Sequence, residues 1–395
     1  MDSQPPSIKS RSKLSHIISE YSDIILGIIF SILTYYFYIT NNQVLSVLSI
    51  AIAIGSFSLT VAEITDILAD RFEEPYASFV LTFSAVIVEI VLLFMIILHT
   101  SDSTQGLETV KGGIISAVIV DMNVLLGLAI LIGGLNYKEQ EHNKDTSSTY
   151  TTLLLVATSA LLVPSIINYT KDSQKLFSAS VAISILLFIF YIFIFIFQTK
   201  THKEFFRVEG KSRFKILQKK AKERARKKRE NIQEEQDEDY IFEKFPSSLN
   251  LLAIFIFIFI IGVLAETFAK NGMVLAKEYG ISAGLAGLII AIIAVSPEIM
   301  TAIKAAREDE IQRVVNIAMG ASTVSIMLTV PILMMLSYAN GIELTLDFNA
   351  FQVGALLLTI ILAWKTTDNG ETNYFEGISH LMFFASYATI ATLYN

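Results

Sequence analysis

The chain has 395 residues, of which 53% are hydrophobic and only 17% are charged, and its mean hydropathy is +0.56. Because roughly 25% of the residues in an average soluble domain are charged, this composition excludes an ordinary soluble protein. The chain contains no cysteine, which excludes disulfides, thiolate metal sites and cysteine nucleophiles. The formal net charge of −7 is less informative than where the charges lie.

Repeated apolar runs of about 20 residues match the roughly 30 Å hydrocarbon core of a bilayer. They predict an all-α, polytopic membrane protein with about 11 transmembrane helices. The predicted spans are 21–40, 43–67, 76–99, 112–135, 149–169, 175–198, 248–268, 281–303, 313–338, 348–363 and 374–393.

One large hydrophilic linker, residues 199–247, separates the sixth and seventh predicted spans. It contains the basic run KILQKKAKERARKKRENI (215–232) and then the acidic run QEEQDEDYIFE (233–243). Lysine and arginine near span ends favour the cytoplasmic side, and a cytoplasmic linker places 25 of the 30 Lys and Arg residues inside. The sequence therefore predicts a multi-pass protein of the plasma (inner) membrane with a cytoplasmic N-terminus and linker and an external C-terminus. The linker is either a solvated connector that meets anionic lipid or a regulatory segment that senses divalent cations.

Two glutamates lie deep inside apolar runs. Glu89 is in FVLTFSAVIVEIVLLFMIIL (79–98), and Glu298 is in GLAGLIIAIIAVSPEIMTAI (284–303). A carboxylate at this depth costs several kcal/mol unless it is compensated, so an acid inside a membrane is a functional hypothesis by default. One glutamate in each half of the chain predicts a site built from both halves, and this indicates cation transport.

The two halves share a duplicated pattern. The segments 60–90 and 263–299 each contain an Ala-Glu pair, a polar break and an apolar run that ends in Glu-Ile. In the predicted orientation the two glutamate spans run in opposite directions, which is an inverted repeat with a binding site near the bilayer midplane. The predicted parts are an N-terminal tail with the first transmembrane helix (1–42), a first transporter repeat (43–198), the charged linker (199–247) and a second transporter repeat (248–395).

The residue types at the proposed site favour hard cations, because the chain has no cysteine and no pair of membrane histidines. Calcium takes six to eight oxygen ligands, and we expect these from the two glutamates together with Asn123, Ser322 and Ser325. Two carboxylates neutralise one calcium ion or hold two protons, since burial and a neighbouring negative charge both favour the protonated form of an acid. Calcium and protons would then compete for the same oxygens, and this competition would couple their transport.

Six further residues are candidates for a proton path or for support of the site. Pro297 cannot bond the carbonyl of Ile293, so it predicts a kink and a carbonyl free to bind a cation. Polar residues also hold membrane helices together without any other role, and this alternative stays open for each candidate. The six candidates are Asp66, Glu63, Asp121, Glu266, Pro297 and Ser84.

Three segments resemble the bacterial ChaA-type calcium/proton antiporters of the cation/calcium exchanger superfamily. They are EPYASFVLTFSAVIVEI (74–90), SPEIMTAIKAAREDEIQRVVNIAMGASTVSIMLTVP (296–331) and QTKTH (198–202). The resemblance implies two inverted five-helix repeats plus an additional N-terminal helix, and exchange of cytoplasmic calcium, often also sodium or potassium, for external protons. It also places Glu89 and Glu298 at the positions of the two acidic cation ligands.

The chain departs from the superfamily pattern in two places. A Gly-Asn pair is expected before each glutamate, whereas this chain has Ala-Val-Ile-Val and Ala-Val-Ser-Pro. The expected Gln of the last repeat helix is replaced near Val324.

We therefore predict a secondary active calcium/proton antiporter, not an enzyme, with no resident cofactor. Its partners are inorganic cations and the lipid bilayer, with no nucleic acid, and its oligomeric state, monomer or homo-oligomer, stays open. The alternative is a sodium(potassium)/proton antiporter with little calcium transport. A channel lined by the acids is a third hypothesis, but a channel needs no inverted repeat. A pump driven by ATP is disfavoured, because the sequence has no Walker-type phosphate loop.

Overall fold

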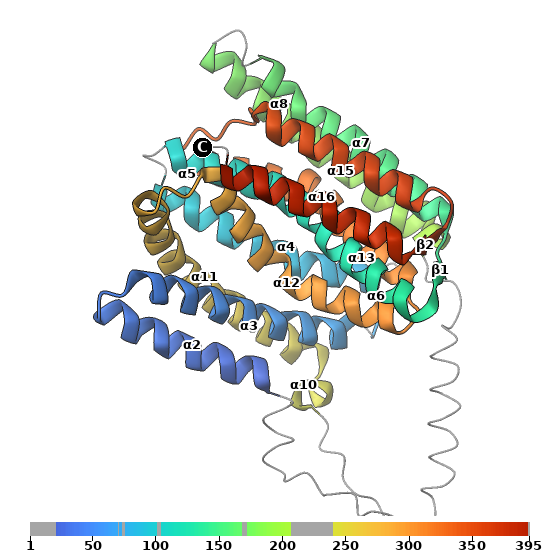
Figure 1. The fold of residues 1–395 in the computed structure, drawn as a ribbon, viewed down its shortest axis with the longest axis horizontal. Coiled ribbons are helices and arrows are strands. Elements are labelled where there is room, and N and C mark those ends of the chain that lie inside the picture. The colour runs from blue at the N-terminus through green and yellow to red at the C-terminus, as the bar shows by residue number, and fades with distance from the viewer. Residues whose placement is uncertain are drawn as a thin grey trace, which may run out of the picture.

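The computed structural model describes residues 21–69, 71–72, 76–100, 104–167, 172–206 and 240–393. The predicted N-terminal tail up to residue 20, the basic run of the linker and most of its acidic run lie outside these residues. The described part is a bundle of long helices with one two-stranded sheet (Figure 1).

Eleven spans run through the described bundle, and each corresponds to a predicted one. They are α2 (Ser22–Ile39), α3 (Gln43–Ala69), α4 (Tyr76–Thr100), α5–η1–α6 (Thr104–Val120, Asp121–Leu125, Leu126–Tyr137), α7 (Lys144–Ile167), α8–η3 (Ser173–Ile196, Phe197–Thr201), α11 (Ser247–Glu278), α12 (Ala283–Arg307), α13–η5–α14 (Ile311–Val324, Ser325–Thr329, Val330–Ala339), α15 (Ala350–Thr367) and α16 (Tyr374–Leu393). The shorter elements are β1 (Glu139–Glu141), η4 (Lys203–Phe206), α10 (Ile241–Lys244) and β2 (Glu371–Asn373).

Ten of these spans are long and apolar enough to cross a membrane. The eleventh is α16, a helix of 20 residues that packs against α6. The prediction of about 11 transmembrane helices is therefore confirmed in outline, and the helices extend further than predicted at several ends. The largest extension is in α11, which continues to Glu278 instead of residue 268.

The helices end where local chemistry satisfies their free backbone groups. Asn349 and Gln352 form a capping box at the start of α15, and the Ser282 side chain accepts a bond from the backbone N–H of Leu285 at the start of α12. Gly280 and Gly341 follow α11 and α14 with φ of 65° and 75°, a conformation that glycine adopts readily. Apart from the linker, the connections between the described spans are short, so consecutive spans within each half alternate in direction.

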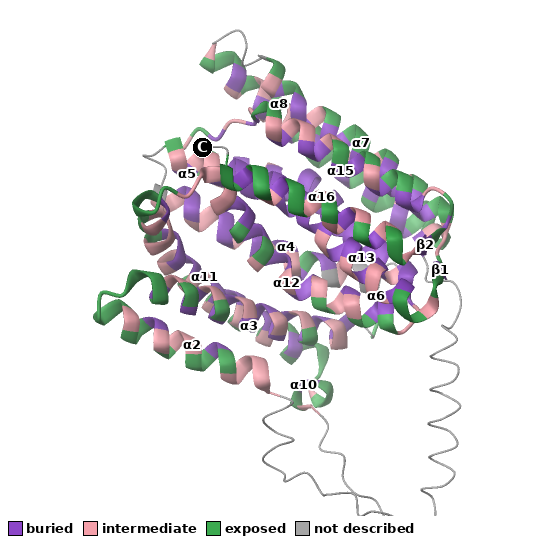
Figure 2. Ribbon diagram, viewed as in Figure 1, coloured by how far each residue is buried: buried purple, intermediate pink, exposed green. Residues whose placement is uncertain are grey.

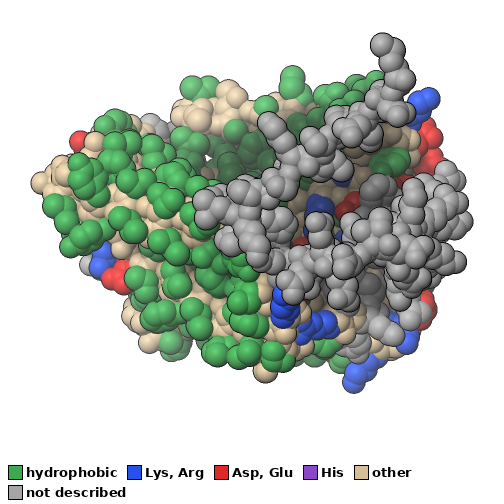
Figure 3. All heavy atoms as spheres, turned by 90° about the horizontal axis from the view of Figure 1, so that it is seen from below, with side chains coloured by type: hydrophobic (Ala, Val, Ile, Leu, Met, Phe, Trp, Pro, Cys, Tyr) green, Lys and Arg blue, Asp and Glu red, His purple; other side chains and the backbone are tan. Residues whose placement is uncertain are grey.

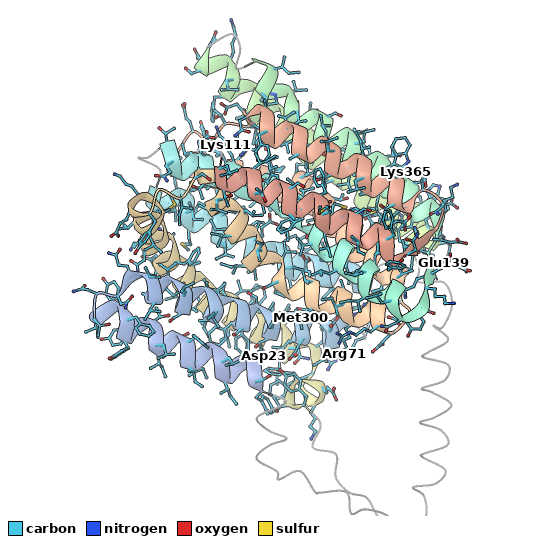
Figure 4. All side chains as sticks on the ribbon, in the orientation of Figure 1. Asp23, Arg71, Lys111, Glu139, Met300 and Lys365 are labelled. Atoms are coloured by element: carbon cyan, nitrogen blue, oxygen red, sulfur yellow. The ribbon has the colours of Figure 1, made fainter. Side chains whose placement is uncertain are left out.

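This alternation gives the bundle two ends, and the linker end is the one at which η4 ends and α10 begins. There Arg71 donates to the carbonyl of Phe245 (2.7 Å), and β1 pairs antiparallel with β2. At the opposite end Lys111 forms an ion pair with Asp347 (2.6 Å). Figure 4 shows Lys111 far from Glu139, which belongs to β1.

The helices form layers around a buried centre. Helices α3 and α11 pack side by side and both contact α4, α3 also contacts α12, and α2 covers α3 on the outside (Figure 1). Buried residues concentrate on the central spans, whereas α2 and α8 are largely exposed (Figure 2). The exposed side chains of α2 include Ile32, Tyr35 and Ile39, and hydrophobic side chains spread over much of the face in Figure 3. Apolar side chains that face outward fit a lipid environment.

The order of the spans confirms two inverted repeats preceded by α2. Helices α3 to α8 make five spans, and α11 to α16 make five more. The second span of each set carries its glutamate, and α4 runs away from the linker end while α12 runs toward it. The third span of each set is interrupted near its middle by a π-helix, η1 or η5. These two π-helices were not predicted from the sequence.

Candidate functional site

Glu89 lies in the middle of α4 and points into the bundle. Glu89 is 6% exposed. The Oε2 atom accepts a hydrogen bond from Ser325 Oγ (2.8 Å) and a longer one from Thr329 Oγ1 (3.5 Å). Both donors belong to η5, so the π-helix of the second repeat supplies the partners of the acid of the first repeat. The Oε1 atom has no hydrogen-bond partner among the described residues.

Glu298 lies on α12 and borders a cavity of ≈ 20 Å³, which we name cavity 1. The residue is 9% exposed, and its Oε1 atom has no partner within the described structure. A cavity of this size holds about one water molecule, so it has room for one small ion. The polar residues that line cavity 1 are Ser58, Thr82, Ser84, Glu298 and Thr301.

Asp121 brings a third carboxyl group to the same region. It is the first residue of η1 and is 1% exposed. Its Oδ2 atom accepts a hydrogen bond from Ser322 Oγ (3.1 Å), and its Oδ1 atom has no partner in the described part of the chain. Glu298 interacts electrostatically with Glu89, and Asp121 interacts with both glutamates. The structure therefore brings together five predicted residues: Glu89, Glu298, Asp121, Ser322 and Ser325.

These acids do not form a closed cage of carboxylates. No group of three or more Asp, Glu, His or Cys side chains among the described residues is placed to hold one metal ion. A cation at Glu89 and Glu298 would therefore need further oxygens from hydroxyl groups, carbonyls or water. Calcium and sodium both accept such oxygens.

Asn123 faces away from the glutamates toward α15 and α16. Its Nδ2 atom donates to Thr359 Oγ1 (3.0 Å) and to the carbonyl of Ile119 (3.1 Å). Its Oδ1 atom contacts His380 Nδ1 (3.1 Å), and the other ring nitrogen of His380 contacts Thr366 Oγ1 (3.0 Å). In this conformation the amide of Asn123 joins helices, so its role as a cation ligand stays a prediction without support from these contacts.

Pro297 lies inside an unbroken α12 and lines cavity 1. The prediction that the carbonyl of Ile293 is free was wrong, because Ser296 Oγ donates to it (2.8 Å). The hydroxyl one residue before the proline thus replaces the missing backbone donor. Ser84 lines the same cavity from α4, which continues without a break past Glu89.

The remaining candidates lie nearer to the ends of the bundle. Asp66 forms an ion pair with Arg313 of α13 (2.7 Å), and both side chains are 23% exposed. Ala62, four residues before Asp66, and Ile317, four residues after Arg313, both line cavity 1. Because residues four apart stack on one helical face, the ion pair lies one turn from cavity 1, on its linker side.

Glu63 and Glu266 do not reach the central acids. Glu63 is exposed on α3 near the linker end, where it interacts with Asp23 and Tyr240. Glu266 is 46% exposed and forms an ion pair with Lys270 (2.7 Å). A proton path through either residue stays a prediction.

Sequence reasoning missed Thr329, Thr82, Ser58 and Thr301. Single hydroxyl residues inside apolar helices give no signal of their own, because such residues commonly bond their own backbone. Thr329 had one available signal, since it follows Ser325 by four residues and therefore shares its face.

A family model described as sodium/calcium exchanger protein matches residues 41–200 and 249–393. The chain belongs to this family. The two matched segments contain the two five-span repeats and exclude most of the linker.

Relatives in the sodium/calcium exchanger family cover most of the chain. The sodium-potassium/proton antiporter ChaA of Escherichia coli (strain K12) is 26% identical over 343 residues, 85% of this chain and 86% of the relative. The Ca(2+)/H(+) antiporter of Aphanothece halophytica is 23% identical over 279 residues, 69% of this chain and 70% of the relative.

Two solved structures share the fold. The structure of native YfkE has a TM-score of 0.72 at 17% identity and covers 94% of this chain and 99% of its own. The H+/Ca2+ exchanger CAX has a TM-score of 0.62 at 13% identity and covers 95% and 92%. At these identities the likeness concerns the fold.

Proposed function

We propose that this chain is a secondary active antiporter that exchanges calcium for protons at a site shared by Glu89 and Glu298. One observation carries the proposal: two acids from oppositely directed helices are buried at the centre of the bundle, and each keeps a carboxylate oxygen without a protein partner among the described residues. Relatives named Ca(2+)/H(+) antiporters support calcium as the substrate.

Coupling follows from competition for these oxygens. Two ionised carboxylates balance the charge of one calcium ion, and two protonated carboxyl groups are neutral without an ion. A state with two bare carboxylates side by side in a low dielectric is costly, so the site exchanges one occupant for the other. Ser325 holds Oε2 of Glu89 in place during this exchange, whereas Glu298 faces cavity 1.

We place the linker end on the cytoplasmic side and the membrane as the plasma (inner) membrane, because most Lys and Arg residues then lie inside. In this orientation cavity 1 is the cytoplasmic approach to Glu298, and the Asp66–Arg313 ion pair closes it. Alternating access would require this ion pair to open, which assigns Asp66 to the entry path. Calcium would leave the cytoplasm as protons enter.

A second candidate is a sodium(potassium)/proton antiporter. It is favoured by the name of the Escherichia coli relative, a sodium-potassium/proton antiporter at 26% identity. The same glutamates would then bind monovalent ions, and the hydroxyl-rich lining of cavity 1 suits them as well.

Reconstitution into liposomes with an imposed pH gradient tests both candidates. Calcium, sodium and potassium are added in turn, and the cation that dissipates the gradient is the substrate. We expect calcium to do so, without channel-like conductance. Dissipation by sodium or potassium but not by calcium would reject the first candidate in favour of the second.

A further inference from the structure

A second cavity, cavity 2, lies on the linker side of Glu89. Its volume is ≈ 20 Å³, enough for about one water molecule. Six of its ten lining residues bear an uncharged oxygen: Thr82, Tyr150, Tyr191, Gln198, Asn316 and Thr323. The Tyr191 residue is 6% exposed, and its hydroxyl has no partner among the described residues. A buried hydroxyl without a partner is costly, so this cavity suits a guest that offers an oxygen or a positive charge.

Cavity 2 leads toward the glutamate site. Thr323 and Val324 line its deep side, and the next residue of the same helix, Ser325, donates to Glu89. Thr82 lines both cavity 2 and cavity 1. The cavity therefore lies between the linker end of the bundle and the carboxylate of Glu89.

The short helix η4 covers cavity 2 at the linker end. Phe206 is 2% exposed and lines the cavity, and its ring meets that of Tyr150 edge-on with a centroid distance of 5.3 Å. The carbonyl of Phe206 accepts a bond from Asn316 Nδ2 (3.0 Å), and the carbonyl of Phe205 accepts one from Thr146 Oγ1. Two hydrogen bonds and one aromatic contact thus seat this single turn on α7 and α13.

One turn of α13, residues 312–316, holds both the ion pair beside cavity 1 and the helix η4 beside cavity 2. Asn316 holds η4, and its Oδ1 atom accepts a bond from Gln312 Nε2 (3.1 Å). Arg313, between these two residues, holds Asp66 of α3. A movement of the first turns of α13 would therefore release the ion pair over cavity 1 and the aromatic ring over cavity 2 together.

We infer that Phe206 is the lid of a linker-side access route to Glu89, and that cavity 2 is an uncharged station for the transported cation and its water. The absence of fixed charge suits a transient station, because an acid there would hold a divalent ion. The identity of the cation rests on the proposed function, whereas closure of the cavity by Phe206 does not. Because η4 belongs to the linker segment 199–247, the lid connects this segment to the transport pathway.

Cysteine accessibility tests the lid directly, since the chain has no cysteine of its own. Thr323→Cys places one thiol in cavity 2, and its reaction with a small cationic methanethiosulfonate is followed in nanodiscs, where both ends of the bundle are open to solvent. We expect slow modification with Phe206 present, at least tenfold faster modification with Phe206→Ala, and slow modification again with Phe206→Trp. Phe205→Ala is the matched control, because Phe205 contacts Phe197 and His202 and does not line cavity 2.

A second thiol separates lid opening from loss of structure. Thr158 is fully buried on α7, so Thr158→Cys should stay unreactive in the Phe206→Ala background. A change of less than twofold at Thr323→Cys on removing Phe206, or an equal rise with Phe205→Ala, would overturn the lid. Calcium uptake by the chain without these substitutions is measured in parallel, and its absence would reject the proposed function while leaving the accessibility result valid.

Discussion

Replacing Glu298 by glutamine removes one of the two charges that the proposed site needs and keeps the shape of the side chain. Glu298 is 9% exposed, borders cavity 1 and has an Oε1 atom without a partner in the described structure. Glutamine fills the same space and offers an oxygen and two N–H donors. The substitution therefore tests the charge and not the packing.

The expected effect on calcium binding is large. With one carboxylate left, a bound calcium ion would keep an uncompensated charge in a buried site, and leaving a charge unpaired costs about 3–5 kcal/mol. Since each 1.4 kcal/mol is a factor of ten, calcium binding should weaken by roughly two to four orders of magnitude. The fold should survive, because the amide neither repels Glu89 nor carries a charge to desolvate.

Calcium uptake into proteoliposomes under a pH gradient, with thermal unfolding of the same preparation, gives both readouts. We expect Glu298→Gln to abolish uptake without lowering the unfolding midpoint, and Glu89→Gln to do the same. Glu278→Gln is the control, because Glu278 is exposed at the end of α11 and belongs to no candidate path, so uptake should persist. Uptake near the original rate in folded Glu298→Gln would refute its place in the site.

Four further outcomes follow from individual contacts. Ser325→Ala removes the 2.8 Å hydrogen bond to a buried carboxylate, worth about 1.5–3 kcal/mol, so the calcium concentration for half-maximal uptake should rise about ten- to a hundredfold; an unchanged value would contradict this. Asp121→Asn should reduce uptake less than either glutamine variant, as measured in the same vesicles. Asp66→Asn breaks a partly exposed ion pair worth at most about 1 kcal/mol, so the unfolding midpoint should change little while a cysteine at Ala62 becomes more reactive. Burial lowers the pKa of His142 below its ordinary value near 6.5. Because the folded protein resists protonation of this side chain, the free energy of unfolding should fall as the pH drops below about 6.5. The His142→Gln variant should therefore lose less stability between pH 7.5 and 5.5.

The spans and their directions could be predicted because they depend on local properties. A run of about 20 apolar residues satisfies its backbone only as a helix when it lies in lipid, and each of the eleven predicted runs is a helix. The two glutamates were equally visible, since a charge in such a run is rare. Where the prediction fell short, as at the end of α11, the helix continues into a polar stretch that composition does not distinguish from a loop.

The contacts of the site could not be predicted in the same way. The π-helices at Asp121 and Ser325 contain no proline or glycine, and their wider turns depend on packing within the bundle. Ser296 bonds the carbonyl of Ile293, which the effect of Pro297 alone would have left free. The amide of Asn123 looks like a cation ligand in the sequence, yet the structure pairs it with His380, 257 residues away. Such pairings depend on tertiary structure.

The two glutamates are related by an inverted repeat and yet have different surroundings. Two hydroxyl groups of η5 are directed at Glu89, whereas η1, which begins with the acid Asp121, contains no serine or threonine that could serve Glu298. Ser322 of α13 occupies one oxygen of that acid, so the second repeat supplies the donors and the first repeat receives them. An arrangement of this kind fixes Glu89 and leaves Glu298 freer to change partners beside cavity 1. In the proposed exchange between a metal ion and protons, Glu89 would therefore be the anchored ligand and Glu298 the responsive one.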